Sequence, residues 1–521
     1  MKKRLLAIVA AGVLSAGSLA QAEDLKIAFA DNLSSLDPQL NNFAGDRSAG
    51  LFFFDMLVNN YYNKLLPGLA TSWKNIDPNT WEFKLRQGVK WSDGQPFVAD
   101  DVVFSINRLI NKVPGSVAPF TGYVRTIESV TVQDPETLII KTNVPNPDLP
   151  LNLASVHIVS KHGTENASSE DFNSGKALIG TGPYKLSSYT PGARIVAEKN
   201  PSYWGEQPIW DKVDYAYTAN AASRTAALLA GDVDVIDKVS VSDLPKLQKE
   251  PKVSVFAYNG LRVFLLQPSF NPAVNKYITD NNDKPLDKNP LLDVRVREAL
   301  SLAINREAIA DRILQGGVTV ASQWMPEGSI GYNPDIKPIA FDAAKAKALL
   351  AEAGYPDGFK LTVHVPTDRY PLAPETVQAV AQFWTRIGVK THVEVVPWAV
   401  YSSAARKNEY AMSVIAWGNG TGEASYAMVN ILATVDPDKG LGASNWGHYS
   451  SEKLDGYLTQ VTAEFDDAKR EALMRDAAVA VSEEVGIIPL FHYKNIWAAK
   501  KGLVVKPLSS DRTVPAMVTK E

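Results

Sequence analysis

The chain of 521 residues carries 53 lysines and arginines against 57 aspartates and glutamates, which gives a formal net charge of −4. A mildly acidic chain without runs of basic residues argues against nucleic acid or an anionic membrane as its main partner. The sequence contains no cysteine, so disulfides, a thiol nucleophile and cysteine-ligated zinc or iron–sulfur sites are excluded.

Residues 1–22 have the pattern of a signal peptide. Positive residues 2–4 precede an apolar stretch over residues 5–20, and residues 20–22 supply a small-x-small cleavage site. The apolar stretch is short for a membrane span of about 20 residues and lacks a stop-transfer flank, which disfavours a membrane anchor. A lipoprotein needs a cysteine directly after its cleavage site. We therefore expect a soluble periplasmic protein that is cleaved after export and is not a lipoprotein.

Strands and helices alternate in the first part of the chain. A strand is expected over residues 25–30, and the period-2 pattern of residues 80–97 indicates another strand followed by a turn. Apolar residues at helical spacing predict a helix over residues 100–110, and residues 130–142 have the pattern of two strands joined by a turn. The chain is also far longer than the ~250–300 residues at which a single core stops growing, so we expect two or more lobes.

The second part of the chain has stronger helix signals. Residues 296–317 read as one amphipathic helical stretch, and residues 342–354 as a second helix with Asp342 as its N-cap. Predicted strands over residues 360–365 and 390–398 flank a helix through residues 376–388, which is the order of a βαβ unit. The sequence therefore predicts a mixed α/β protein throughout.

Motifs for catalysis and metal binding are missing. The sequence has no Gly-x-Ser-x-Gly elbow, no His-Glu-x-x-His motif, no phosphate-binding glycine loop and no dinucleotide fingerprint. Its six histidines are scattered, without a pair at i, i+4. We predict no catalytic residue, no metal site and no cofactor, although chance pairs among the many carboxylates leave a hydrolase as an alternative.

A glycine-rich loop follows a predicted strand over residues 410–417. In residues 418–423, three glycines alternate with Asn419, Thr421 and Glu423. Glycine permits a positive φ or a close approach of the backbone to a ligand. The loop is therefore a candidate binding site.

Five segments of the chain match a known family pattern in the expected order. They are GLATSWKNIDPNTWEFKLRQGVKWSDGQPFVADDVVFSINRL (68–109), LIGTGPYKLSSYTPGARIVAEKNPSYWG (178–205), RTAALLAGDVDVI (224–236), NPLLDVRVREALSLAINREAI (289–309) and ALLAEAGYPDGF (348–359). Together they resemble the extracellular solute-binding proteins of family 5, the dipeptide, oligopeptide and nickel group that serves ABC importers. The resemblance extends over essentially the whole chain after residue 22.

This resemblance implies a two-lobed α/β periplasmic binding protein fold (class II-like, cluster C) with an extra inserted domain and a ligand cleft between hinged lobes. Domain I would comprise residues 23–65, 182–288 and 487–521. The inserted domain II would comprise residues 66–181, and domain III, the second lobe, residues 289–486. Closure of such lobes removes a ligand from water and strengthens its polar contacts.

The resemblance also bears on the glycine-rich loop. In peptide-binding relatives, an aspartate three residues after the tryptophan equivalent to Trp417 binds the α-amino group of the peptide. Gly420 occupies that position here, so the usual amine anchor is absent. The sequence TGEAS of residues 421–425 more closely resembles the loop of glutathione-binding members.

We hypothesise that Glu423 captures a ligand amine in place of the missing aspartate. Asn419, Thr421 and backbone N–H groups of the loop, including those of Gly418 and Gly420, would then bind polar oxygens of the ligand. The alternative is that Glu423 caps the helix that follows, because acidic residues favour a helix N-terminus.

Further candidates come from other parts of the chain. Arg369 follows the strand over residues 360–365, where dipeptide-binding relatives place an arginine that binds a carboxylate through its planar donors. Trp398 and Tyr401 match a stretch that lines the side-chain pocket in relatives. Weaker candidates for the ligand site are Leu36, Phe120, Tyr123, Arg224 and Trp324.

These features predict a monomeric receptor that captures a dipeptide, oligopeptide or glutathione-like solute and delivers it to the permease of an ABC importer, without catalysis. Other members of the family bind an opine, a nickel chelate or an oligosaccharide, and these ligands stay open as alternatives. A periplasmic chaperone or hydrolase on the same scaffold is the alternative from a different class, because a fold does not fix a function.

Overall fold

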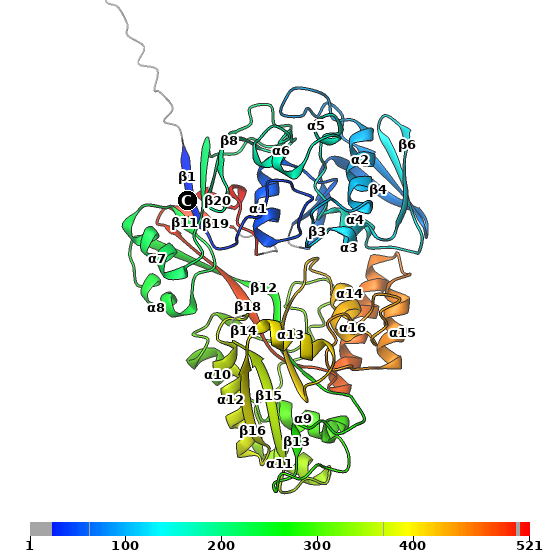
Figure 1. Ribbon diagram of the computed structural model, residues 1–521, viewed down its shortest axis with the longest axis vertical. Coiled ribbons are helices and arrows are strands. Elements are labelled where there is room, and N and C mark those ends of the chain that lie inside the picture. The colour runs from blue at the N-terminus through cyan, green and yellow to red at the C-terminus, as the bar shows by residue number, and fades with distance from the viewer. Residues whose placement is uncertain (1–22, 62, 368, 507–510) are drawn as a thin grey trace, which may run out of the picture.

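The computed structural model describes residues 23–61, 63–367, 369–506 and 511–521. The predicted signal peptide, residues 1–22, lies outside these ranges. Figure 1 shows two lobes joined by two long strands, β12 (Val253–Pro268) and β18 (Ile488–Lys500), and we name them the upper and the lower lobe after this view. The expected two-lobed α/β architecture is thereby confirmed. Within the described ranges, no helix is long and apolar enough to cross a membrane.

The upper lobe contains a base domain and an inserted domain. The base domain is built from β1 (Asp24–Phe29), α1 (Ala44–Phe53), β8 (Tyr184–Thr190), β9 (Arg194–Lys199), β10 (Lys212–Tyr217), α7 (Ala221–Ala230), β11 (Val235–Ile236), α8 (Leu244–Leu247), β19 (Leu503–Val505) and β20 (Val518–Lys520). The inserted domain is built from β2 (Val58–Tyr61), β3 (Lys64–Pro67), β4 (Ala70–Asp77), β5 (Thr80–Leu85), α2 (Ala99–Ile110), α3 (Thr121–Val124), β6 (Ile127–Asp134), β7 (Thr137–Thr142), α4 (Leu149–Leu153), α5 (Lys161–Thr164) and α6 (Ser169–Asn173).

The lower lobe contains the remaining strands and helices. They are β13 (Ile278–Thr279), α9 (Val294–Leu302), α10 (Arg306–Arg312), β14 (Val318–Val320), α11 (Ala343–Glu352), β15 (Lys360–Pro366), α12 (Ala373–Arg386), β16 (Lys390–Val396), α13 (Trp398–Arg406), β17 (Met412–Gly418), α14 (Ala424–Ala427), α15 (Glu452–Val461) and α16 (Asp467–Glu484). Separate apolar clusters fill the base domain, the inserted domain and the lower lobe, as expected for a chain too long for one core.

A nine-stranded mixed sheet runs through both lobes in the order β17-β12-β18-β11-β1-β10-β9-β8, with β14 paired to β18. The antiparallel register of β12 and β18 shifts between Asn259 and Val263. At this hinge, a Cβ on Gly260 would lie 2.5 Å from the Tyr493 carbonyl oxygen, so only glycine lets the strands approach this closely. Because β12 continues into the lower lobe, residues 263–288, assigned from the sequence to domain I, lie there with β15 and β17.

Most of the predicted elements are found with small shifts at their ends. β15 and β16 are parallel and α12 connects them, which confirms the βαβ unit. The side chain of Asp342 accepts the N–H of Lys345 and caps α11 as predicted. The single helix predicted over residues 296–317 is wrong, because the Asn305 side chain accepts the N–H of Ala308 and starts α10 as a second helix.

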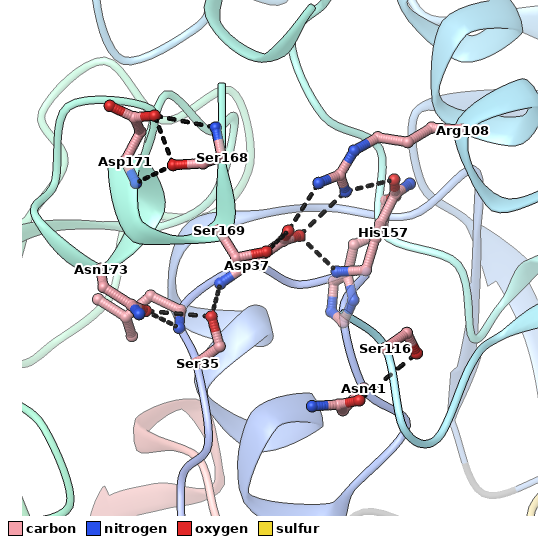
Figure 2. Close-up of polar contacts among 12 residues, drawn as sticks. Ser35, Asp37, Asn41, Arg108, Ser116, His157, Ser168, Ser169, Asp171 and Asn173 are labelled. Atoms are coloured by element: carbon pink, nitrogen blue, oxygen red, sulfur yellow. Dashed lines mark hydrogen bonds and ion pairs between the residues drawn. The ribbon is translucent and has the colours of Figure 1, made fainter. Parts of the chain in front are cut away.

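A buried polar cluster joins the base domain to the inserted domain (Figure 2). The fully buried Asp37 accepts two hydrogen bonds from the Arg108 guanidinium, at 3.0 and 2.6 Å, and one from the Ser169 hydroxyl at 2.9 Å. Arg108 belongs to α2 and Ser169 to α6. The neighbouring Leu36 donates its N–H to Asn173 and buries its side chain in the base-domain core. Leu36 therefore helps to fix the position of the inserted domain.

Candidate ligand-binding site

β17 leads directly into the loop of residues 418–423 and forms an edge of the nine-stranded sheet. Tyr401 of α13 donates its hydroxyl to the Val414 carbonyl at 2.8 Å and accepts the Val414 N–H at 2.6 Å. Its side chain is fully buried. Tyr401 therefore satisfies the backbone of the strand that carries the loop, and its ring is part of the lower-lobe core.

Replacing Tyr401 with phenylalanine is expected to lower the free energy of unfolding by about 2 kcal/mol, because the buried N–H and C=O of Val414 both lose their partner. Urea titration of the two proteins measures this loss. Tyr457→Phe is the control, since Tyr457 is half-buried and no hydrogen bond of its hydroxyl is found among the described residues. A change under about 0.5 kcal/mol is expected. Equal losses in the two variants would contradict the bridging role.

Asn419 organises the loop from within. Its Oδ1 accepts hydrogen bonds from the N–H groups of Thr421 and Gly422, both at 2.9 Å, and from the Thr421 hydroxyl at 3.0 Å. Its Nδ2 donates to the Glu423 carbonyl at 2.7 Å. Gly422 has a φ of +81°, a conformation that side chains with a Cβ disfavour. The side chain of Asn419 is thus used to hold the loop conformation.

Glu423 is almost completely buried, at 3% exposure. Its carboxylate forms an ion pair with Arg470 and accepts a hydrogen bond from the Ser425 hydroxyl at 3.1 Å. Burial and the nearby Asp148 carboxylate raise the pKa of Glu423 to about 7. Glu423 is the N-cap residue of α14, as the helix-cap alternative expects, but its side chain makes no capping hydrogen bond. In this arrangement the carboxylate is paired with Arg470, and the capture of a ligand amine by Glu423 stays a prediction.

The loop touches the upper lobe directly. Asn60 donates a hydrogen bond to the Thr421 carbonyl at 2.9 Å, and Asn63 donates to the Gly328 carbonyl at 3.0 Å. Further out, the rings of Trp81 and Phe465 lie 6.1 Å apart. These contacts come from opposite sides of the hinge, so the lobes stand in a closed arrangement.

A cavity of about 70 Å³ remains between the closed lobes. It is lined by Leu51, Met56, Asn59, Asn60, Tyr61, Ala154, Ser155, Leu261, Gly420, Thr421 and Arg512. Among the described residues that line the cavity, only Arg512 is charged. At ~30 Å³ for each water molecule, the cavity holds about two waters. A larger ligand therefore requires the lobes to separate.

Two of the sequence candidates line this cavity, and Tyr123 lies next to one of them. Gly420 and Thr421 line it, and the hydroxyl of Tyr123 lies 3.4 Å from the position that a Cβ on Gly420 would take. The ring of Phe120 lies 6.1 Å from that of Tyr123 and is buried. The half-buried ring of Trp417 packs against Tyr426, at 5.4 Å. The inserted domain and the loop thus contribute to the same site.

Arg369 and Trp398 form a second group on the lower lobe. The exposed guanidinium of Arg369 lies over the Trp398 ring at 5.2 Å and over the Tyr370 ring at 6.0 Å. Arg262, a residue of β12, lowers the pKa of Tyr370 together with Arg369, although burial raises it overall. The Arg262 guanidinium also lies against Gly418. This group is therefore close to the start of the loop.

Two of the weaker candidates have structural roles in this arrangement. Arg224 is 2% exposed and donates hydrogen bonds to carbonyl oxygens of Thr218, Ala219, Asp237 and Lys238. Trp324 is also 2% exposed and packs in the lower-lobe core. Neither residue lines the cavity between the lobes.

Residues that the sequence did not single out complete the site. Asn59 and Asn60 stand beside aromatic residues at the end of a short strand, a local pattern that could have suggested a binding surface. Arg262 and Arg470 carry no such local signal, because the hinge strand β12 and the packing of α16 bring them to the loop. Arg512 carries none either, since it reaches the cavity from the segment between β19 and β20.

Two other features of the structure lie away from this cavity. A hollow of about 520 Å³ is open to solvent beside β13, β15 and β16, at the lower end of the molecule in Figure 1. It is lined mainly by lysine and threonine side chains. Among the residues that the structure describes, no group of three or more His, Cys, Asp or Glu is placed to hold a metal ion.

Comparisons with known proteins agree with this architecture. The dipeptide-binding protein of Escherichia coli K12 is 28% identical over 477 residues, which cover 85% of this chain and 84% of that protein. Heme-binding protein A of Haemophilus influenzae is 28% identical over 473 residues, covering 85% of this chain and 82% of that protein. The solved structure of HbpA2 from Haemophilus parasuis superposes with a TM-score of 0.84 at 27% identity, covering 96% of this chain and all of that one.

A family model gives the classification directly. The model for bacterial extracellular solute-binding proteins, family 5 (middle part), matches residues 64–438. This range includes the inserted domain from β3 onward, the hinge strand β12 and the loop of residues 418–423. The chain belongs to the bacterial extracellular solute-binding proteins, family 5.

Proposed function

We propose that this protein is the periplasmic receptor of an ABC importer, which captures a peptide or peptide-like solute and delivers it to the membrane permease. The observation that carries the proposal is the cavity between the lobes, which both polar and apolar side chains line. Gly420 and Thr421 of the lower lobe share it with Asn60 and Arg512 of the upper lobe. The hinge strands let such a cleft open and close around a ligand.

The chemistry of the cavity matches that of a peptide. Amide side chains and loop backbone pair with peptide N–H and C=O groups, and the Arg512 guanidinium suits a carboxylate. The similarity to a dipeptide-binding protein supports the same ligand class. In this proposal the binding residues are Trp417, Gly418, Asn419, Gly420, Thr421 and Tyr123, with Arg369 and Trp398 at the edge of the site.

The proposal includes the cellular context. The protein would be exported, cleaved after residue 22, and act as a soluble monomer without a lipid anchor and without turnover of its ligand. The chain would leave domain I at the register shift along β12 and return to it at the same level along β18. Closure would then rotate the lower lobe against the base domain and the inserted domain.

Native mass spectrometry of the protein purified from a bacterial periplasm tests the proposal. We expect the mass of a chain that begins at Glu23, carrying one peptide or peptide-like molecule that is released unchanged. Recovery of a coloured complex with haem would show that the ligand is not a peptide. If no small molecule co-purifies, and dipeptides, tripeptides and glutathione all fail to raise the melting temperature, the peptide assignment is overturned.

A further inference from the structure

Arg470 of α16 links the two lobes through its own ion pairs. Its side chain is 6% exposed, and its Nε donates to the Val461 carbonyl at 3.1 Å. Its Nη2 contacts a carboxylate oxygen of Glu423 in the same lobe and a carboxylate oxygen of Asp148 in the inserted domain. One guanidinium is therefore shared by two acidic side chains from opposite sides of the lobe boundary.

The Arg470 guanidinium and its two carboxylate partners lie next to the candidate ligand loop. Glu423 ends the loop, and Ser425 follows it at the start of α14. The Ser425 hydroxyl is 3.1 Å from the Glu423 carboxylate and 3.4 Å from that of Asp148. Figure 1 shows α14 and α16 below α3 and α4, at the side of the molecule where the lobes meet. The four polar side chains thus connect the loop to the inserted domain.

The two ion pairs of Arg470 respond differently to opening of the hinge. Glu423 and Arg470 belong to the same lobe, so their contact persists when the lobes separate. The contact with Asp148 crosses the boundary and is lost when they separate. Asp148 is 26% exposed in its side chain, so water replaces this contact easily.

We infer that the Asp148–Arg470 ion pair holds the lobes closed over a bound ligand, and that Glu423 positions Arg470 for this contact. The inference rests on the proposed function and adds a regulatory element to the same site. Asp148, Glu423 and Arg470 are positioning residues, since none of them lines the cavity. The protein thereby contributes closure energy that does not depend on ligand chemistry.

Closure through this ion pair depends on pH. The charged groups that act on Glu423 are Asp148 at the start of α4 and Arg470 on α16, and Asp467 acts in turn on Arg470. Burial is the larger cause of the raised pKa of Glu423, and the Asp148 carboxylate raises it further. The contribution of Asp148 is present only where the lobes meet. The closed form therefore binds a proton on Glu423 more tightly than the open form, and lowering the pH from 8 to 6 favours closure.

The separation of the lobes can be measured without knowing the ligand, because the chain has no cysteine of its own. Spin labels on the introduced cysteines Lys141→Cys and Gln460→Cys report the distance between the lobes by pulsed electron paramagnetic resonance. We expect Asp148→Asn to lower the ratio of closed to open molecules about fivefold and to weaken its increase between pH 8 and pH 6. Glu136→Gln, on an exposed hairpin of the same domain, is the matched control.

A substitution that keeps the charge of Asp148 distinguishes the loss of the ion pair from a general structural effect. Asp148→Glu keeps the charge and is expected to retain both the closed fraction and its pH response. If the wild type and Asp148→Asn have equal closed fractions and equal pH responses, the inference is overturned. If ligand still closes both proteins in that case, the proposed function stands. A single fixed distance at every pH, with and without dipeptides or glutathione, would overturn both proposals.

Discussion

Replacing Asp37 with alanine is expected to lower the free energy of unfolding by about 3–5 kcal/mol, as for other buried ion pairs that lose one partner. Asp37 is fully buried and accepts hydrogen bonds from Arg108 and Ser169. The Arg108 side chain is 13% exposed, so water can replace the lost carboxylate only in part. At the joint of the two upper domains, the variant leaves the Ser169 hydroxyl without Asp37 and the Arg108 guanidinium with the Gln39 side-chain oxygen as its remaining acceptor.

Urea titration of the purified protein measures this loss. The control is Asp214→Ala, which breaks an ion pair with Arg194 on the surface, where the arginine side chain is 55% exposed. That variant is expected to lose less than about 1 kcal/mol. Similar losses for the two variants would contradict a special role for the cluster of Figure 2. Because Asp37 fixes the inserted domain, its loss is also expected to weaken ligand binding.

Arg470→Leu is expected to lower the free energy of unfolding by about 3–5 kcal/mol at pH 8, because it leaves the buried Glu423 carboxylate without its counter-charge. Glu423 is 3% and Arg470 6% exposed. The matched control lies on the same helix. Arg475→Leu removes an exposed ion pair with Glu471, and its loss is expected to stay below about 0.5 kcal/mol.

The effect of Arg470→Leu is expected to be smaller at pH 5 than at pH 8. Burial and the Asp148 carboxylate raise the pKa of Glu423 from 4.5 to about 7. A carboxyl group with a raised pKa binds its proton more tightly in the folded state, so its stabilising contribution is present below pH 4.5 and is lost as the pH rises through 7. At pH 5 the protonated Glu423 needs no counter-charge, and the variant loses less.

Urea titrations at pH 5 and pH 8 check this dependence. A double variant, Arg470→Leu with Glu423→Gln, removes the unpaired charge and is expected to recover much of the loss at pH 8. A loss that is the same at both pH values, or that Glu423→Gln does not reduce, would show that Arg470 acts through packing alone.

Local sequence patterns predicted the elements that depend on neighbours within one or two turns. The Asp342 cap needs only the N–H of Lys345, and the parallel pair of β15 and β16 follows from strand and helix patterns in βαβ order. The break between α9 and α10 was missed, because Asn305 interrupts a helix without disturbing its apolar periodicity. The family motifs spread along the whole chain predicted the two-lobed fold. The apolar periodicity of one segment cannot predict it.

The sequence by itself determined the α/β class, the family and the position of the glycine-rich loop. The tertiary structure decided what the side chains near that loop do. Glu423 stands beside loop glycines in the sequence, but its partner Arg470 comes from α16 and its second neighbour Asp148 from the inserted domain. The charge state of Glu423 depends on burial and on these distant charges. The packing of the lower lobe brings Arg470 to Glu423, and the closing of the two lobes about β12 and β18 brings Asp148.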